Sequence, residues 1–214
     1  MDPKKSTPKD KERLPIDRTN AMSDGILAIV ITLLVLCIDI PSNHKFSEDG
    51  LISFIVKLEP SLVAYGMSFV MVGIYWVQHV SLFQFLRHVN RHLIWLNILF
   101  LLPITLLPFV AKVKAMYRYD PLVVALFAGV HILCGLFLLT LWAYTHAHPE
   151  LLAGPITPRV KRSMTLRILV SPLICLVAMG VAFVEVDLAT YMFVVIPFFY
   201  ISHHTVDTFL KEER

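Results

Sequence analysis

The stretch RTNAMSDGILAIVITLLVLCIDIP, residues 18–41, decides how this chain folds. Its first residues are mostly polar, and within residues 26–37 Thr32 is the one polar side chain. An α-helix rises about 1.5 Å per residue, so residues 18–40 could cross a hydrocarbon core of roughly 30 Å. Asp24 would then lie close to or inside the bilayer, where a carboxylate is rare unless it has a partner and a purpose. The stretch therefore predicts a membrane-spanning helix that does more than anchor the chain.

The composition places the whole chain among membrane proteins. It is 57% hydrophobic and 16% charged, with a mean hydropathy of +0.69, whereas about a quarter of the residues in soluble proteins are charged. The net charge of +3 could suggest a nucleic-acid partner. In a membrane protein, however, surplus Lys and Arg usually reports topology, so we expect no nucleic acid. The three cysteines lie in separate apolar runs without metal-ligand spacing, and we expect no cofactor and no structural metal.

Breaker residues and charges divide the apolar sequence into six spans. The polar segment at residues 1–17 is expected to be a disordered cytoplasmic tail, because it holds three prolines and mixed charges. One transmembrane domain is expected at residues 18–210, followed by a short cytoplasmic end at 211–214. The six expected helices cover residues 18–40, 60–86, 93–111, 122–145, 164–184 and 188–209.

The distribution of basic residues predicts the orientation of the chain. With both termini inside the cell, the cytoplasmic segments hold 14 of the 19 Lys and Arg residues, in groups of six, two, four and two. Short loops near the ends of spans are where such a bias is informative. We therefore expect a multi-pass protein of the cell membrane with both termini in the cytoplasm.

Two sequence motifs resemble those of a known family. RTNAMSDG, residues 18–25, is similar to the R-x-x-x-F-S-D signature on the first helix of the transmembrane protein 175 family, whose members are potassium channels. The segment GIYWVQHVSLF, residues 73–83, also resembles that family. Met22 stands where the family usually has an aromatic residue, which keeps the bulk and loses the flat ring.

The resemblance implies an all-α membrane protein that is a tetrameric, potassium-selective cation channel and not an enzyme. Animal members carry two six-helix units, whereas this chain has one S-D-G motif, so the resemblance implies a homotetramer whose first helices line the pore. It also implies a prokaryotic plasma membrane, with potassium ions and the lipid bilayer as partners. The sequence lacks the TVGYG loop that strips water from potassium in other channels.

One face of the first helix is the candidate pore lining. At helical spacing this face presents Ile29, Thr32 or Leu33, and Leu36. The resemblance implies a constriction at Ile29, with Leu33 and Leu36 as the next layers and Thr32 as a ring of hydroxyl groups. Val30 is displaced by about 100° and is expected off this face. The alternative is that the face packs against other helices or lipid, and that Thr32 bonds a carbonyl one turn back.

The polar residues of the first helix need partners, because a lone charge at membrane depth costs several kcal/mol. The second span offers Trp76 and His79 on one face, and the third offers Asn97. Trp76 alone could be an interfacial residue, and His79 alone could be a satisfied core histidine. The resemblance implies instead a structural polar network that holds the first helix in register, made of Arg18, Ser23, Asp24, Trp76, His79 and Asn97.

Two other classes of function remain as alternatives. His88 and His92 form an H-x-x-x-H pair and His203 and His204 are adjacent, as in membrane di-iron oxygenases. Such sites need about eight imidazoles in several clusters, which this sequence does not provide. The second alternative is a proton-linked secondary transporter or a proton leak pathway, with Asp24 and His79 as a relay. The long apolar stretch between residues 29 and 36 argues against continuous proton transfer.

Overall fold

The structure is a computed structural model that describes residues 14–38 and 46–202, without the side chains of residues 46–50, 201 and 202. Within these residues the chain is helical, and its β-structure is limited to isolated bridges, which confirms the all-helical prediction. The helices are α1 (Ile16–Leu33), α2 (Phe46–Phe83), α3 (Arg91–Thr105), α4 (Leu107–Met116), α5 (Pro121–Ala147), α6 (Pro158–Val181) and α7 (Val186–Ser202). In the described part of the chain, five segments are long and apolar enough to cross a membrane, and Val186–Tyr200 is a shorter apolar helix.

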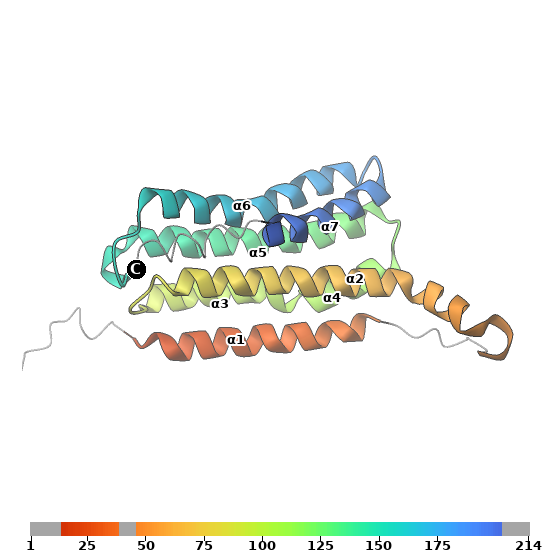
Figure 1. Ribbon diagram of the computed structural model, residues 1–214, viewed down its shortest axis with the longest axis horizontal. Coiled ribbons are helices and arrows are strands. Elements are labelled where there is room, and N and C mark those ends of the chain that lie inside the picture. Colours follow the sequence, from red (N-terminus) through yellow and green to blue (C-terminus); the bar gives the residue numbers. More distant parts are fainter. Residues whose placement is uncertain (1–13, 39–45, 203–214) are drawn as a thin grey trace, which may run out of the picture.

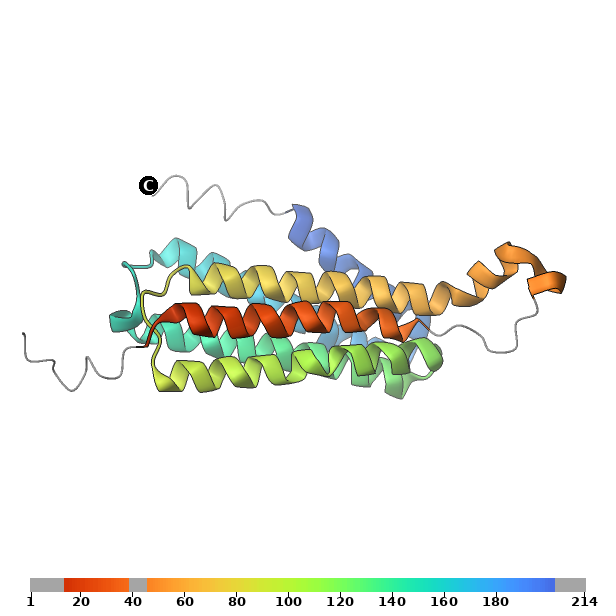
Figure 2. The same cartoon turned by 90° about the horizontal axis from the view of Figure 1, so that it is seen from below.

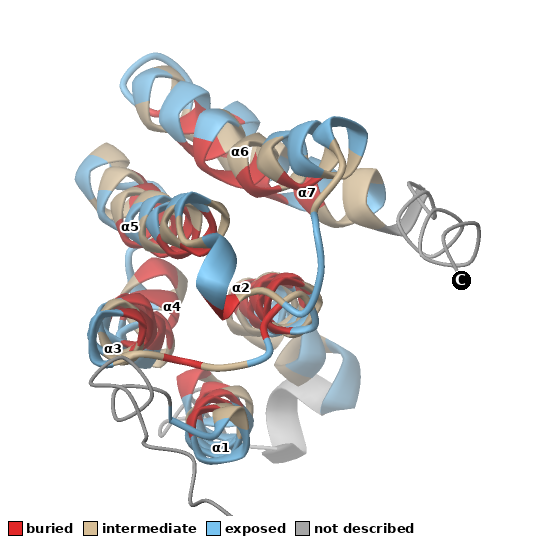
Figure 3. Ribbon diagram, turned by 90° about the vertical axis from the view of Figure 1, so that its left-hand side faces the viewer, coloured by how far each residue is buried: buried red, intermediate tan, exposed pale blue. Residues whose placement is uncertain are grey.

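The helices form an elongated bundle in which α2 is central (Figures 1 and 3). On one side of α2 lie α1, α3 and α4, and on the other lie α5, α6 and α7. The edge helix α1 packs against α2 and α3, and its remaining side faces away from the bundle. Figure 2 shows α1 between these two helices for most of its length. Among the described residues, one side of the first helix therefore has no partner from its own chain.

The first span does not stay α-helical to its end. The α-helix stops at Leu33 and a 3₁₀ helix continues over Leu34–Cys37. The expected helix over residues 18–40 is therefore a 3₁₀ helix rather than an α-helix at Leu34–Cys37, although no Gly or Pro lies in this stretch. Tightening of the last turn is a common way to satisfy orphan carbonyls at a helix end. Residues 39–41 lie outside the described part of the chain.

The second and third spans differ from their expected bounds. Helix α2 begins at Phe46, well before residue 60, and Pro60 lies inside it. The third span is divided at Leu106 into α3 and α4, and the Leu106 N–H donates to the Pro103 carbonyl. Pro108 then lies in the first turn of α4, where a residue without an N–H costs no helical hydrogen bond.

Two contacts join segments of the bundle that are distant in sequence. At the end where α1 begins, the Leu14 N–H donates to the Val89 carbonyl at 2.8 Å, which ties the start of α1 to the connection between α2 and α3. In the other half, α5 and α6 approach closely at Gly135, where a Cβ atom would lie 2.8 Å from Cγ of Pro172. A larger residue at Gly135 would force these helices apart.

Candidate functional site

Helix α1 has one side buried in the bundle and one side exposed. Thr19, Ser23, Leu27 and Val30 are buried, with the spacing of three and four residues that defines one face of a helix. Leu34 continues this face into the 3₁₀ helix and is fully buried. The buried face positions α1 against α2 and α3 and thereby fixes which residues point outward.

The exposed side carries all four residues that the sequence nominated as pore lining. The exposed fraction is 58% for Ile29, 42% for Leu33 and 63% for Leu36, and Thr32 is also exposed. Figure 3 shows this outer side of α1 facing away from every other helix. Val30 is 2% exposed, so it lies off this face as expected, but it is a packed core residue.

The hydroxyl of Thr32 bonds within its own helix. Its Oγ1 donates to the Ile29 carbonyl at 2.8 Å, which is the expected alternative of a bond to a carbonyl one turn back. A hydroxyl has one hydrogen and two acceptor lone pairs. Because the hydrogen is used inside the helix, the lone pairs of Thr32 remain as acceptors on the exposed side.

A chain of hydrogen bonds joins α1 to α3 and α2 in the interior. The Ser23 hydroxyl donates to the Thr19 carbonyl at 3.0 Å, Asn97 Nδ2 donates to Ser23 Oγ at 2.8 Å, and His79 Nε2 lies 2.9 Å from Asn97 Oδ1. The single hydroxyl hydrogen of Ser23 is already committed, so the Asn97 amide must donate to it. The Asn97 carbonyl oxygen therefore faces His79, and His79 Nε2 carries the hydrogen.

Two phenylalanines fix the orientation of the His79 ring. It stacks on Phe83 with ring centroids 4.1 Å apart and on Phe100 with centroids 5.6 Å apart. His79 and Asn97 are each 1% exposed and Ser23 is fully buried. A satisfied and tightly packed polar chain of this kind specifies one register between α1, α2 and α3.

The charged residues of α1 lie outside this buried chain. The Trp76 indole Nε1 donates to Asp24 Oδ1 at 2.9 Å, in a half-exposed position. Arg18 is exposed, and no ion pair joins it to Asp24 among the described residues. The structure therefore brings five of the six nominated network residues into two groups, Ser23–Asn97–His79 and Asp24–Trp76, and leaves Arg18 apart from both.

A second buried cluster was not predicted from the sequence. The Tyr75 hydroxyl lies 3.1 Å from His131 Nδ1 and 3.5 Å from Ser171 Oγ, which joins α2 to α5 and α6. Tyr75 precedes Trp76, so the two side chains leave α2 in different directions, one into the core and one toward α1. The tyrosine in the GIYW motif is the one sequence feature that could have indicated this cluster. His131 and Ser171 lie in apolar runs without a motif of their own.

The geometry gives the metal-site alternative no support. Across residues 14–38 and 46–202, no three His, Cys, Asp or Glu side chains are grouped as metal ligands. His88 is half-buried in the connection between α2 and α3, and His92 is exposed in the first turn of α3. His203 and His204 lie outside the described part of the chain.

Comparison with known proteins assigns the chain to a family. The family of the endosomal/lysosomal potassium channel TMEM175 matches residues 18–108. A potassium channel of Streptomyces collinus is 30% identical over 80% of this chain and 84% of its own length, and one of Chamaesiphon minutus is 29% identical over 83% and 89%. The crystal structure of a lysosomal potassium-selective channel TMEM175 homolog from Chamaesiphon minutus superimposes with a TM-score of 0.76 at 26% identity, covering 89% of this chain and 98% of that one. This chain, with its R-x-x-x-x-S-D motif on α1, belongs to the TMEM175 family.

Proposed function

We propose that this protein is a potassium-selective cation channel, in which four copies of the chain surround a pore lined by α1. The observation that carries the proposal is the exposed side of α1, which is mostly apolar although the opposite side anchors the helix. Relatives that cover most of the chain are named potassium channels. The family is one of ion channels, so the protein is not an enzyme and the di-iron oxygenase alternative is wrong.

The constriction is formed by large apolar side chains. In four copies, Ile29, Leu33 and Leu36 form successive rings, with Ile29 as the narrowest. Hydrophobic constrictions gate by losing their water, since an ion cannot enter without part of its hydration shell. Gly25 lies on the same side, and a Cβ atom added to it would meet no other atom within 4 Å. Small residues let helix backbones approach closely, so Gly25 lets the four α1 helices converge on the N-terminal side of the rings.

Discrimination among cations comes from Thr32. Its hydrogen is bonded to the Ile29 carbonyl, so four Thr32 oxygens present acceptor lone pairs to the pore. Oxygen ligands replace part of the hydration shell of a hard cation such as potassium. Because the Thr32 hydroxyl is held by its own helix, the ring of oxygens needs no rearrangement when an ion arrives.

The buried polar chain supports the pore from behind. Ser23, Asn97 and His79 fix the rotation of α1, and a rotation of about 100° would replace Ile29 by Val30 at the axis. Asp24 and Trp76 form a second bond between α1 and α2 at the rim of this interface. The orientation that we propose places both termini in the cytoplasm of a prokaryotic cell and α1 across its plasma membrane.

Bilayer recording of the purified protein under opposed potassium and sodium gradients tests this function. A selective channel gives a passive current that reverses near the potassium equilibrium potential, while crosslinking in mild detergent stops at four chains. A reversal potential that follows the proton gradient would favour the proton pathway. A stable monomer that conducts would contradict the assembly.

A further inference from the structure

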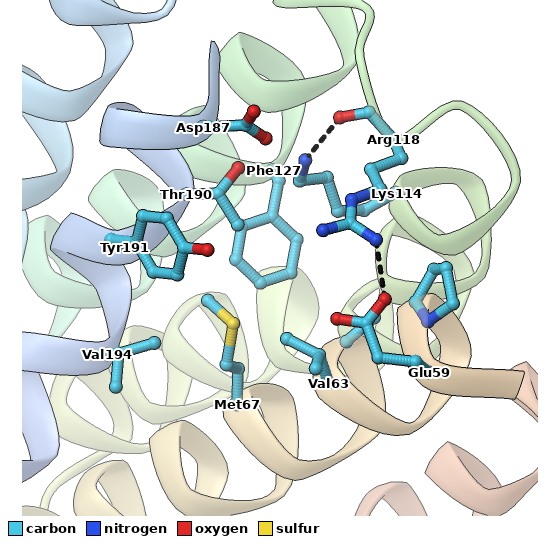
Figure 4. A pocket seen from close by; sticks show the side chains of 12 residues that line it. Glu59, Val63, Met67, Lys114, Arg118, Phe127, Asp187, Thr190, Tyr191 and Val194 are labelled. Atoms are coloured by element: carbon cyan, nitrogen blue, oxygen red, sulfur yellow. Dashed lines mark hydrogen bonds and ion pairs between the residues drawn. The ribbon is translucent and has the colours of Figure 1, made fainter. Parts of the chain in front are cut away.

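A small cavity lies at the end of the bundle opposite to the start of α1, among α2, α4, α5 and α7 (Figure 4). Its volume is about 80 Å³. Figure 4 shows Asp187 and Tyr191 of α7 on one wall, Lys114 and Arg118 on the other, and Phe127 between them. None of the residues that line the cavity belongs to the Ser23–Asn97–His79 chain or to the pore-lining candidates of α1.

Lys114 is buried at this cavity with an incomplete set of partners. The residue is 7% exposed, and its Nζ donates to the Arg118 carbonyl at 2.8 Å. An ammonium group has three N–H donors, and in the described part of the chain this carbonyl is the acceptor within hydrogen-bond distance. A buried ammonium with open donors is costly, and an acceptor in the cavity would offset that cost.

The neighbouring charges differ in how they are paired. Burial alone would lower the pKa of Arg118, but the hydrogen bond and the charge of Glu59 raise it above the ordinary value. Asp187 is exposed on the opposite wall and attracts Lys114, but among the described residues no ion pair joins the two. The cavity thus presents an open cationic donor on α4 and an open carboxylate on α7.

This arrangement favours a ligand that carries both charges. A simple anion would be repelled by Asp187, and a simple cation would be repelled by Lys114 and Arg118. A phosphate ester with an ammonium group at its other end places each charge against its opposite. The cavity lies at one end of a membrane-spanning bundle, near the level of the lipid head groups, where zwitterionic phospholipids are present.

Apolar surface continues from the cavity along α2 and α7. Val63 and Val194 line the cavity and are exposed by 40% and 36%. Further along α2, Phe69 and Val70 begin a second hollow of about 420 Å³ that reaches Trp76 and Tyr200. Phe69 is ten residues from Glu59, about 15 Å along the helix and about half the thickness of the hydrocarbon core. An acyl chain that starts at the cavity would therefore reach the second hollow.

We propose that the cavity among α2, α4, α5 and α7 binds a zwitterionic phospholipid, with its phosphate at Lys114, its ammonium group at Asp187 and one acyl chain along the surface between α2 and α7. Lipid binding at this cavity does not require ion conduction, so a failure of the channel proposal leaves it standing. Its role would be to join α7 to α2 and α4 through a bound lipid.

Binding is measured as the rise in the melting temperature of delipidated protein in detergent. Dioleoyl phosphatidylethanolamine is compared with dioleoyl phosphatidylglycerol, which has the same chains and no ammonium group, and with free phosphoethanolamine, which has no chains. We expect phosphatidylethanolamine to stabilise the protein at a lower concentration than either phosphatidylglycerol or free phosphoethanolamine. Equal stabilisation by phosphatidylglycerol, or by free phosphoethanolamine, would overturn the proposal.

Two variants identify the site. Asp187→Asn changes an exposed residue and should leave folding intact, and Lys114→Met removes the buried ammonium. Each should weaken the apparent affinity for phosphatidylethanolamine roughly tenfold or more, since each removes a charge-assisted hydrogen bond. Lys112→Met is the matched control, because Lys112 is half-buried on the same helix and does not line the cavity. Unchanged affinity in Asp187→Asn, or an equal loss in Lys112→Met, would contradict the site.

Discussion

The two sides of α1 differ in almost every physical property although they belong to the same turns of one helix. The inner side buries Ser23 and Val30, and Ser23 belongs to a chain of hydrogen bonds that reaches α3 and α2. The outer side exposes Ile29 and Leu36 and faces away from the other described helices. The inner side thus specifies where the helix lies, and the outer side is free for a task that one chain alone does not complete.

This difference separates two kinds of mutational effect. A change on the inner side should appear first in stability, because it leaves a cavity or an unpaired polar group. A change on the outer side should leave the fold of the chain intact and should appear first in ion flow. The predictions below test this separation, beginning with the largest expected effect.

Asn97→Leu should destabilise the protein most. It leaves the Nε2 hydrogen of His79 buried without an acceptor, at a cost of about 1–3 kcal/mol. Thermal unfolding in detergent measures the loss. Combining it with His79→Phe removes both partners, so the double variant should lose less than the sum of the two single losses. Additive losses would mean that the bond between these residues contributes nothing.

Val30→Ala and Ile29→Ala compare neighbouring residues on opposite sides. Val30 is packed in the core, so its truncation should cost about 1 kcal/mol or more in unfolding free energy. Ile29→Ala should change stability by less than about 0.5 kcal/mol, as exposed positions usually do, and should raise current. The prediction is wrong if Ile29→Ala destabilises the protein as much as Val30→Ala does.

Thr32→Val should act on selectivity without a measurable change in stability. Valine keeps the branched shape and removes the oxygen whose lone pairs face outward. The potassium to sodium permeability ratio should fall severalfold, whereas Thr32→Ser, which keeps the oxygen, should retain most of it. Equal ratios in both variants would exclude the hydroxyl from ion recognition.

Asp24→Asn should have only a small effect on folding. Asparagine can still accept the Trp76 indole hydrogen through its carbonyl oxygen, and the position is exposed. We expect a change within about 1 kcal/mol, because a charged acceptor is replaced by a neutral one. A loss as large as that of Asn97→Leu would mean that Asp24 has a buried partner in the assembled protein.

Much of this fold could be predicted because a membrane-spanning helix is defined by the hydropathy of consecutive residues. The long apolar runs gave the helices, and helical spacing placed Ile29 and Val30 on different sides of α1. The division at Leu106 and the 3₁₀ end at Leu34–Cys37 could not be predicted, since both depend on how the helix ends pack against their neighbours.

The candidate site was only partly accessible from sequence for the same reason. The two motifs contain Ser23, Asp24, Trp76 and His79, and Asn97 was a possible polar partner on the third span, but only the structure gives their pairing. The separation of Arg18 from Asp24 follows from their directions around α1, which differ by about 120°. Lys114 and Asp187 come from segments 73 residues apart in sequence that only the tertiary fold brings to one cavity.

The central claim is that the exposed side of α1 lines the pore, and single-channel recording of Ile29→Asn tests it most directly. Leu176→Asn on α6 is the matched control, because Leu176 has an exposed fraction of 57% against 58% for Ile29. We predict that Ile29→Asn wets the constriction, raises conductance severalfold and moves the reversal potential away from that of potassium, while Leu176→Asn leaves both unchanged. Equal effects of the two substitutions, or unchanged current in Ile29→Asn, would contradict the claim.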